Sequence, residues 1–130
     1  MSVALNHTII WCSDRHRSAD FFAAMYGLPE PQDLFHFRVV KLANGVSLDF
    51  ADHREGPVSP QHYAMLVSED EFTALYGRIL TRGIAHWADP ARTRPGEFNH
   101  NDGGRGVYFE DPDGHFLEAL TVPYGGVADA

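Results

Sequence analysis

Two histidines and two carboxylates occupy matching places in the two halves of the sequence. His7 and His62 each stand near the start of a segment rich in β-branched and aromatic residues, and Asp49 and Glu118 each stand inside an apolar run. Imidazole and carboxylate groups bind divalent metal ions, and two histidines with one carboxylate leave coordination positions open for a substrate. The pattern therefore predicts a metal site with room for chemistry.

Each of these residues also has a structural reading. A single histidine on a strand, His7 or His62 taken alone, is more often a hydrogen-bonded structural residue than a ligand. Glu118 lies between Leu117 and Ala119, where an unpaired charge would cost several kcal/mol. Asp49 fits three roles equally: ligand, support for a ligand, or hydrogen-bonded carboxylate. It is their occurrence together at repeated positions that favours the metal site.

The first half of the chain reads as strand, helix and further strands. Ser13 or Asp14 can cap a helix that Gly27 ends, because glycine accepts the left-handed conformation after a helix. Asn44-Gly45 supplies a tight hairpin turn. The strands are predicted at 3–11, 33–35, 36–42 and 46–51.

The second half repeats this order. Ser68 and Glu71 form a capping box before a helix that ends at Gly83. The apolar stripe predicted for this helix consists of Phe72, Leu75, Ile79 and Leu80. Strands are predicted at 62–67, 86–88, 106–110 and 115–122, and the long polar loop at 89–104 is a candidate lid.

The order of one strand, one helix and about three strands, which occurs twice, predicts an α+β fold of two βαβββ modules. A two-fold repeat also brings equivalent positions of the two halves to one axis. Module one covers about residues 3–52 and module two about 60–122, within a single domain of residues 1–130. The tail at 125–130 is expected to fray.

Composition excludes several functional classes. The formal net charge is −8, and no Lys/Arg cluster is present, which argues against nucleic-acid binding. No apolar run approaches the length of a membrane span, and no signal segment is seen, so we expect a cytoplasmic protein. The only cysteine, Cys12, excludes an internal disulfide framework and is expected to be buried and inert.

With these residues in place, the chain resembles the vicinal oxygen chelate superfamily, which includes glyoxalase I, type I extradiol dioxygenases, fosfomycin-resistance thiol transferases and bleomycin-resistance proteins. The resemblance implies two βαβββ modules that form a paired, partly closed sheet around a central cleft. It also implies that His7, His62 and Glu118 bind one divalent metal ion, with Asp49 as a fourth ligand or a supporting residue.

A second set of residues resembles the extradiol dioxygenase signature in particular. His100 is followed after six residues by Val107-Tyr108, then by Asp111-Pro112, Gly114 and Glu118. In such enzymes the histidine moves a proton beside the site and the tyrosine hydrogen-bonds the substrate's oxygens. The structural alternatives are an exposed loop histidine for His100 and a half-buried core residue for Tyr108. His115, beside a turn, is expected at the surface.

The leading hypothesis is therefore extradiol-type dioxygenation of a catechol-like small molecule, with Fe(II) favoured and Mn, Ni, Co or Zn possible at the same ligands. The first alternative is a glyoxalase-like isomerase or a thiol transferase. A thiol transferase needs cations for a phosphonate or carboxylate, and the chain has only ten Lys plus Arg. The second alternative is a metal-free protein that binds a drug or metabolite. The resemblance also implies a homodimer.

Overall fold

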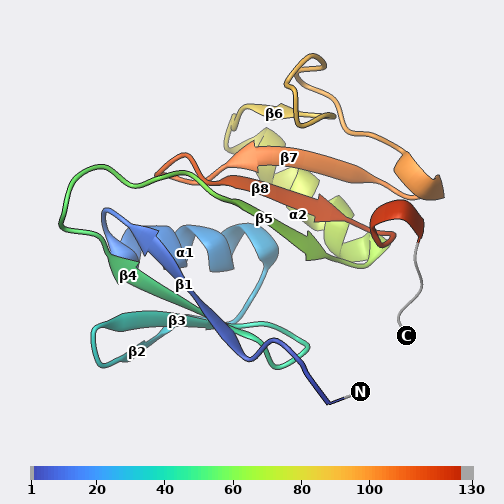
Figure 1. Ribbon diagram of the computed structural model, residues 1–130. Helices are drawn as coiled ribbons and strands as arrows, with labels where there is room; N and C mark the ends of the chain where they lie inside the picture. Colours follow the sequence, from blue (N-terminus) through green and yellow to red (C-terminus); the bar gives the residue numbers. More distant parts are fainter. Residues whose placement is uncertain (1, 127–130) are drawn as a thin grey trace. The chain divides into compact units, whose positions relative to one another are not determined.

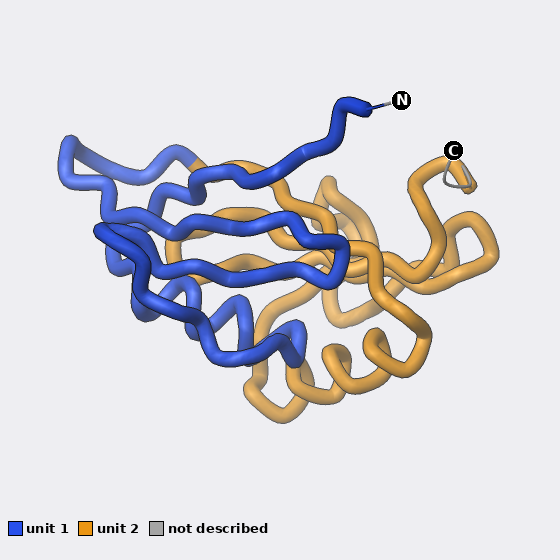
Figure 2. The backbone as a smooth tube through the Cα atoms, turned by 90° about the horizontal axis from the view of Figure 1, so that it is seen from below, with its two compact units in different colours: residues 1–59 blue, residues 60–130 orange. Residues whose placement is uncertain are grey.

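The computed structural model describes residues 2–126 and divides the chain into two compact units, residues 1–59 and 60–130 (Figures 1 and 2). Each unit holds one open four-stranded sheet and one long helix. The elements of each unit follow the order strand, helix and three strands, which confirms the α+β class and the two βαβββ modules.

Unit 1 forms its sheet in the order β1-β4-β3-β2. β1 runs parallel to β4, and the other neighbouring strands are antiparallel. The first strand begins at His7, so the predicted start at residue 3 is wrong, because the β1–β4 ladder begins with the pair His7 and Ser47. The elements are β1 His7–Cys12, α1 Arg15–Tyr26, β2 Gln32–Leu34, β3 Phe37–Lys41 and β4 Ser47–Asp52.

Helix α1 packs on the sheet of unit 1 through its buried face (Figure 1). Asp14 is the N-cap, and its carboxylate accepts the backbone N–H groups of His16 and Arg17. Gly27 ends the helix with φ at 67°. Both ends therefore follow the sequence prediction, since each requires a particular residue type.

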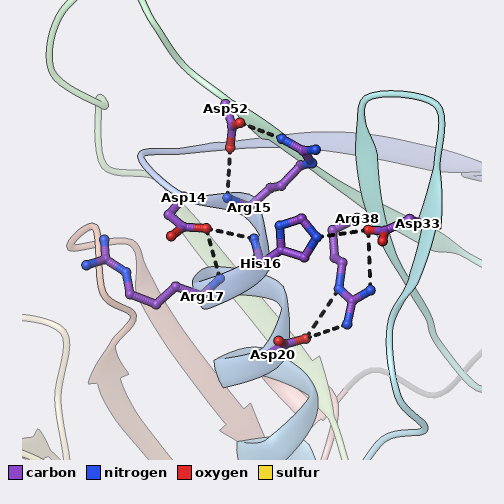
Figure 3. A network of polar contacts seen from close by, with 8 residues as sticks. All are labelled: Asp14, Arg15, His16, Arg17, Asp20, Asp33, Arg38 and Asp52. Carbon is purple, nitrogen blue, oxygen red and sulfur yellow. Dashed lines mark hydrogen bonds and ion pairs between the residues drawn. The ribbon is translucent and has the colours of Figure 1, made fainter.

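Ion pairs fix the ends of these elements in unit 1 (Figure 3). Arg15 donates its backbone N–H and its guanidinium to the two carboxylate oxygens of Asp52, at 2.8 and 2.6 Å. Arg38 bridges Asp20 of α1 and Asp33 of β2. These arginines are engaged in holding helix to sheet.

Unit 2 repeats the topology with the order β5-β8-β7-β6, β5 again parallel to the last strand. Its elements are β5 His62–Leu66, α2 Glu69–Thr81, β6 His86–Trp87, β7 Gly106–Glu110 and β8 Phe116–Leu120, with short 3-10 turns η1 Asn101–Gly103 and η2 Tyr124–Gly126. Part of the tail predicted to fray, Gly125 and Gly126, lies in η2, and the rest lies outside the described residues.

Helix α2 begins with the predicted capping box. The Ser68 hydroxyl accepts the Glu71 N–H at 3.1 Å, and the Glu71 carboxylate accepts the Ser68 N–H at 2.8 Å. Phe72, Leu75 and Ile79 are buried as predicted, whereas Leu80 is 57% exposed and does not belong to the buried stripe. None of the helices in the described part of the chain is both long and apolar enough to cross a membrane.

Candidate metal centre

His62 and Glu118 face each other on neighbouring strands of unit 2. His62 opens the edge strand β5, and Glu118 lies in the middle of β8. Nε2 of His62 is 3.1 Å from Oε1 of Glu118. The Glu118 side chain is only 13% exposed, so its carboxylate lies against the sheet.

The contact of Nδ1, the other ring nitrogen of His62, determines which nitrogen is available to bind an ion. Nδ1 lies 2.9 Å from the carbonyl oxygen of Phe116, and a contact with a carbonyl requires Nδ1 to carry a hydrogen. The neutral ring therefore presents a lone pair on Nε2 toward a carboxylate oxygen that also has lone pairs. Such a pair needs a proton or a cation between its two atoms.

The spacing of the two atoms suits a shared metal ion. A divalent ion binds imidazole nitrogen and carboxylate oxygen at about 2.1 Å each, which places two such ligands roughly 3 Å apart. A carbonyl that accepts a hydrogen bond from the far nitrogen is the usual support of a metal-binding histidine. The donor pair in unit 2 thus fits a metal.

Tyr108 of β7 is the third polar group at this position. It is paired in register with Glu118, and its hydroxyl donates to the Glu118 carboxylate. Burial, and then the negative charge of Glu118, raise the pKa of Tyr108 to about 12. The phenol is consequently a hydrogen-bond donor at any physiological pH.

Aromatic rings extend from Tyr108 along the same face of the sheet. Phe116 stacks on Tyr108 at 5.3 Å between ring centroids, and Trp87 lies 6.0 Å beyond Phe116. The guanidinium of Arg92 lies over both Trp87 and Phe116 and pairs with Glu110. Arg92 has φ at 62°, so this contact is held from a left-handed backbone.

A cavity of about 400 Å³ opens beside Tyr108 and Glu118 within unit 2. Its only Lys or Arg is Arg105, which donates to the side chain and carbonyl of Glu69 and to Thr73. Asp102 and Glu118 bring two carboxylates, so the lining disfavours an anionic ligand. The lining residues are Asn99, Asn101, Asp102, Arg105, Tyr108, Glu118, Leu120, Val122, Tyr124 and Gly125.

His7 and Asp49 stand in unit 1 at the register positions of His62 and Glu118. His7 pairs with Ser47 and Ile9 with Asp49, as His62 pairs with Phe116 and Ala64 with Glu118. The Ser47 hydroxyl donates to Asp49 at 2.6 Å, and exposed His7 contacts the Asn6 side chain at 2.7 Å. Neither contact joins His7 to Asp49, so His7 stays a predicted ligand and Asp49 a predicted fourth ligand or supporting residue.

Within either unit, no three described His, Cys, Asp or Glu side chains form a metal-binding cluster. Unit 2 therefore supplies a pair of donors, His62 and Glu118. His100 is exposed, with its ring 5.2 Å from Phe98. Its neighbours Asn99 and Asn101 line the described cavity and His100 itself does not, so its acid/base role stays a prediction.

Sequence reasoning missed two features of this site. Asn99 is buried and bridges the carbonyl of Ala88 and the N–H of Asn101, which shapes one wall of the cavity. His115 is 1% exposed, so its predicted surface position is wrong. Asp111, whose carboxylate accepts the N–H of His115, turns the chain inward there. For His115 the available signal was Asp111, four residues earlier in the same turn, because an Asp side chain in a turn binds nearby backbone N–H groups. No pattern in the sequence indicated the role of Asn99.

Known proteins are similar to this chain in sequence and in fold. No model of a known protein family matches the chain. Among curated proteins, "Metallothiol transferase FosB" of Shouchella clausii is 31% identical over 90% of this chain and 79% of the relative. "Glutathione transferase FosA" of Serratia marcescens is also 31% identical, over 91% of this chain and 80% of the relative.

Among solved structures, "Oxidase ChaP-H1" is 58% identical, with a TM-score of 0.93 over 96% of this chain and the whole of that chain. "Oxidase ChaP-H2" is 55% identical, also with a TM-score of 0.93, over 98% of this chain and all of that chain. A glyoxalase/dioxygenase from Nostoc punctiforme, at 22% identity, shares the fold, with a TM-score of 0.69 over 92% of this chain and 91% of its own. The chain belongs to the vicinal oxygen chelate superfamily. Its relatives there include both thiol transferases and oxidases.

Proposed function

We propose that this protein is a metal-dependent enzyme that uses O₂ to oxidise a catechol-like small molecule, with extradiol ring cleavage as the reaction. The observation that carries the proposal is the His62–Glu118 pair, whose facing atoms lie 3.1 Å apart while a backbone carbonyl holds the far nitrogen of His62. The resemblance supplies His7 as the remaining ligand, from the matching strand of module one. In ring cleavage both atoms of O₂ enter the product as one ring carbon–carbon bond breaks.

A bound divalent ion supplies open positions that hold two adjacent oxygens of a substrate and favour their deprotonation. Fe(II) suits this chemistry because two histidines and one carboxylate are its usual ligands in oxygenases. The residues of the chain do the rest. Glu118 remains ionised as a ligand, and His62 remains neutral with Nδ1–H on Phe116.

Tyr108 orients the substrate in this proposal. Its raised pKa keeps the hydroxyl protonated, so it can donate a hydrogen bond to a substrate oxygen that becomes negative. His100 is proposed to move a proton from its position beside the cavity-lining residues Asn99 and Asn101. The stacked rings of Tyr108, Phe116 and Trp87 offer an aromatic surface along the same sheet.

Thiol transfer to an epoxide is the second candidate, because the curated relatives at 31% identity are thiol transferases. The cavity in unit 2 argues against it. Its single cation, Arg105, is already bound to Glu69 and Thr73, and two carboxylates share the lining. Among the described lining residues, a phosphonate or a glutathione carboxylate would find no Lys or Arg that is not already paired. The oxidases are also more similar to this chain, at 58% and 55% identity.

The test is metal content and oxygen uptake in three proteins prepared identically: the parent, His62→Ala, and the control His36→Ala, which removes an exposed histidine of unit 1. After anaerobic loading with Fe(II), we expect about one ion per chain in the parent and control and none in His62→Ala. A catechol panel should then show O₂ uptake only with the two loaded proteins.

Other results would redirect the assignment. Metal bound without O₂ uptake, but with thiol addition to an epoxide, would establish the thiol transferase instead. No metal in any of the three proteins would leave the metal-free binding protein. We further propose a homodimer, which sedimentation of the parent protein tests directly.

A further inference from the structure

We propose that His115, buried behind the site, is a positioning residue that holds the start of β5 and thereby sets the ring of His62 for metal binding. The inference rests on the proposed function in taking His62 as a ligand. His115 is not itself placed at the substrate or the metal. It acts through the peptide that precedes His62.

His115 is fixed on two sides. Its backbone N–H donates to Oδ1 of Asp111 at 2.9 Å, and Asp111 is itself only 8% exposed. On the other side, Nδ1 of the His115 ring accepts the backbone N–H of Gln61 at 2.9 Å. The ring also lies edge-on to Tyr63, with 5.5 Å between centroids. A buried side chain thus anchors the residue directly before His62.

Two further hydrogen bonds continue this anchor to the His62 ring. The N–H of Phe116 donates to the carbonyl of Gln61 at 2.8 Å, and Nδ1–H of His62 donates to the carbonyl of Phe116 at 2.9 Å. His115 and Phe116 are consecutive, so one short segment grips both the Gln61 peptide and the His62 imidazole. Since β5 is the edge strand of the unit 2 sheet, β8 is the strand of that sheet that neighbours its first residues.

The chemistry required of residue 115 is an acceptor at one particular atom. An asparagine Oδ1 occupies nearly the position of histidine Nδ1, since both are bonded to Cγ. Glutamine places its oxygen one bond further out, and leucine has no acceptor. The series His115→Asn, His115→Gln and His115→Leu therefore separates the acceptor at the Nδ1 position from bulk and polarity.

The matched control is His86→Leu. His86 is the other buried histidine of unit 2, 8% exposed, with its ring bonded to the Ile84 carbonyl and the Tyr76 hydroxyl. Neither of these two hydrogen bonds reaches β5 or β8. The loss of His86 should lower the thermal midpoint as much as the loss of His115 does, and should leave the position of the His62 ring unchanged.

The experiment measures three quantities for the full-length parent and each variant: the thermal midpoint, the Kd for Co(II), and the ring nitrogen and proton NMR signals of His62 in the metal-free protein, assigned with His62→Ala. We expect His115→Asn to bind Co(II) within about threefold of the parent. His115→Leu and His115→Gln should bind at least tenfold more weakly, the range found when the support of a metal ligand is removed. The hydrogen-bonded Nδ1–H signal of His62 should persist in the parent, His115→Asn and His86→Leu, and be lost in His115→Leu.

Two results overturn the inference. One is an unchanged Kd and His62 signal in His115→Leu. The other is an equal loss of affinity in His115→Leu and His86→Leu, which would assign both histidines to stability alone. If the parent binds no Co(II), the proposed function fails, and the His62 signal in the metal-free variants still decides whether His115 positions that ring.

Discussion

Shortening Glu118 by one methylene is the sharpest perturbation of the candidate metal centre. The substitution Glu118→Asp keeps the charge and the strand, and withdraws the carboxylate by one carbon–carbon bond, about 1.5 Å. The present gap to Nε2 of His62 is 3.1 Å, so the two atoms would stand roughly 4 to 5 Å apart. That separation exceeds the roughly 3 Å expected for two adjacent ligands that each lie about 2.1 Å from one ion.

We expect the metal affinity of Glu118→Asp to fall at least tenfold, about 1.4 kcal/mol, measured by competition with a chromophoric chelator. The free energy of unfolding of the metal-free protein should change by less than about 1 kcal/mol. The His62 side chain is 49% exposed, and an ion pair with an exposed partner contributes little to stability.

Glu110→Asp is the matched control for this measurement. Glu110 lies on the adjacent strand β7 and pairs with Arg92, not with His62. The substitution therefore shortens a glutamate by the same methylene without changing the candidate ligand pair. Its metal affinity should equal that of the parent. Parent-like affinity in Glu118→Asp, or an equal loss in the control, would refute the assignment of Glu118 as a ligand.

Three further predictions concern stability and ionisation. Ser68→Ala removes the capping box of α2 and should lower the free energy of unfolding by about 1 kcal/mol in chemical denaturation, with no change in metal affinity. The pKa of Asp52 is lowered by the Arg15 backbone N–H and then by the Arg15 charge, so its stabilisation is present above the ordinary carboxyl pKa and lost as pH falls below it. The free energy of unfolding of Asp52→Asn, measured by chemical denaturation, should therefore lie about 1 kcal/mol below that of the parent at pH 7, and this difference should shrink as pH falls below 3.8. The pKa of Tyr108 is raised from 10.0 to about 12 in the folded protein, so the unfolded chain loses the phenol proton at a lower pH than the folded chain. Between pH 10 and 12 the free energy of unfolding of the parent should therefore fall by about 1 to 2 kcal/mol relative to that of Tyr108→Phe. In a pH titration followed by tyrosinate absorbance, the increase near pH 12 that belongs to Tyr108 should be missing in Tyr108→Phe.

The elements that the sequence could predict are those in which a local rule requires a particular residue. Asp14 and Gly27 mark the two ends of α1, and Ser68 with Glu71 begins α2. These caps depend on backbone groups within one turn, which the residue types alone satisfy. The start of β1 was not predictable in this way. Residues before His7 have strand-like character, but the ladder to β4 begins only at Ser47.

The site was predictable where it depends on the repeat and not where it depends on tertiary contacts. Aligning the two modules placed His62 and Glu118 at repeat-related positions, whose strand register recurs in both sheets. The burial of His115 follows from the inward turn at Asp111, and the position of Arg105 follows from Glu69 and Thr73 on α2. The Arg105 contacts join residues 36 and 32 apart in sequence, and nothing in the local pattern specifies them.

The two modules share one register yet differ in what that register presents. Where unit 2 has Tyr108, Phe116 and Glu118, the same ladder positions in unit 1 hold Val39, Ser47 and Asp49.

Each change alters the donor pair or a side chain beside it. Val39 offers no hydroxyl, and Ser47 replaces a packing ring with a donor that engages Asp49 at 2.6 Å. Asp49 is also one bond shorter than Glu118. The backbone of the repeat therefore provides two equivalent frames, and three side chains decide that the histidine–carboxylate pair forms in unit 2.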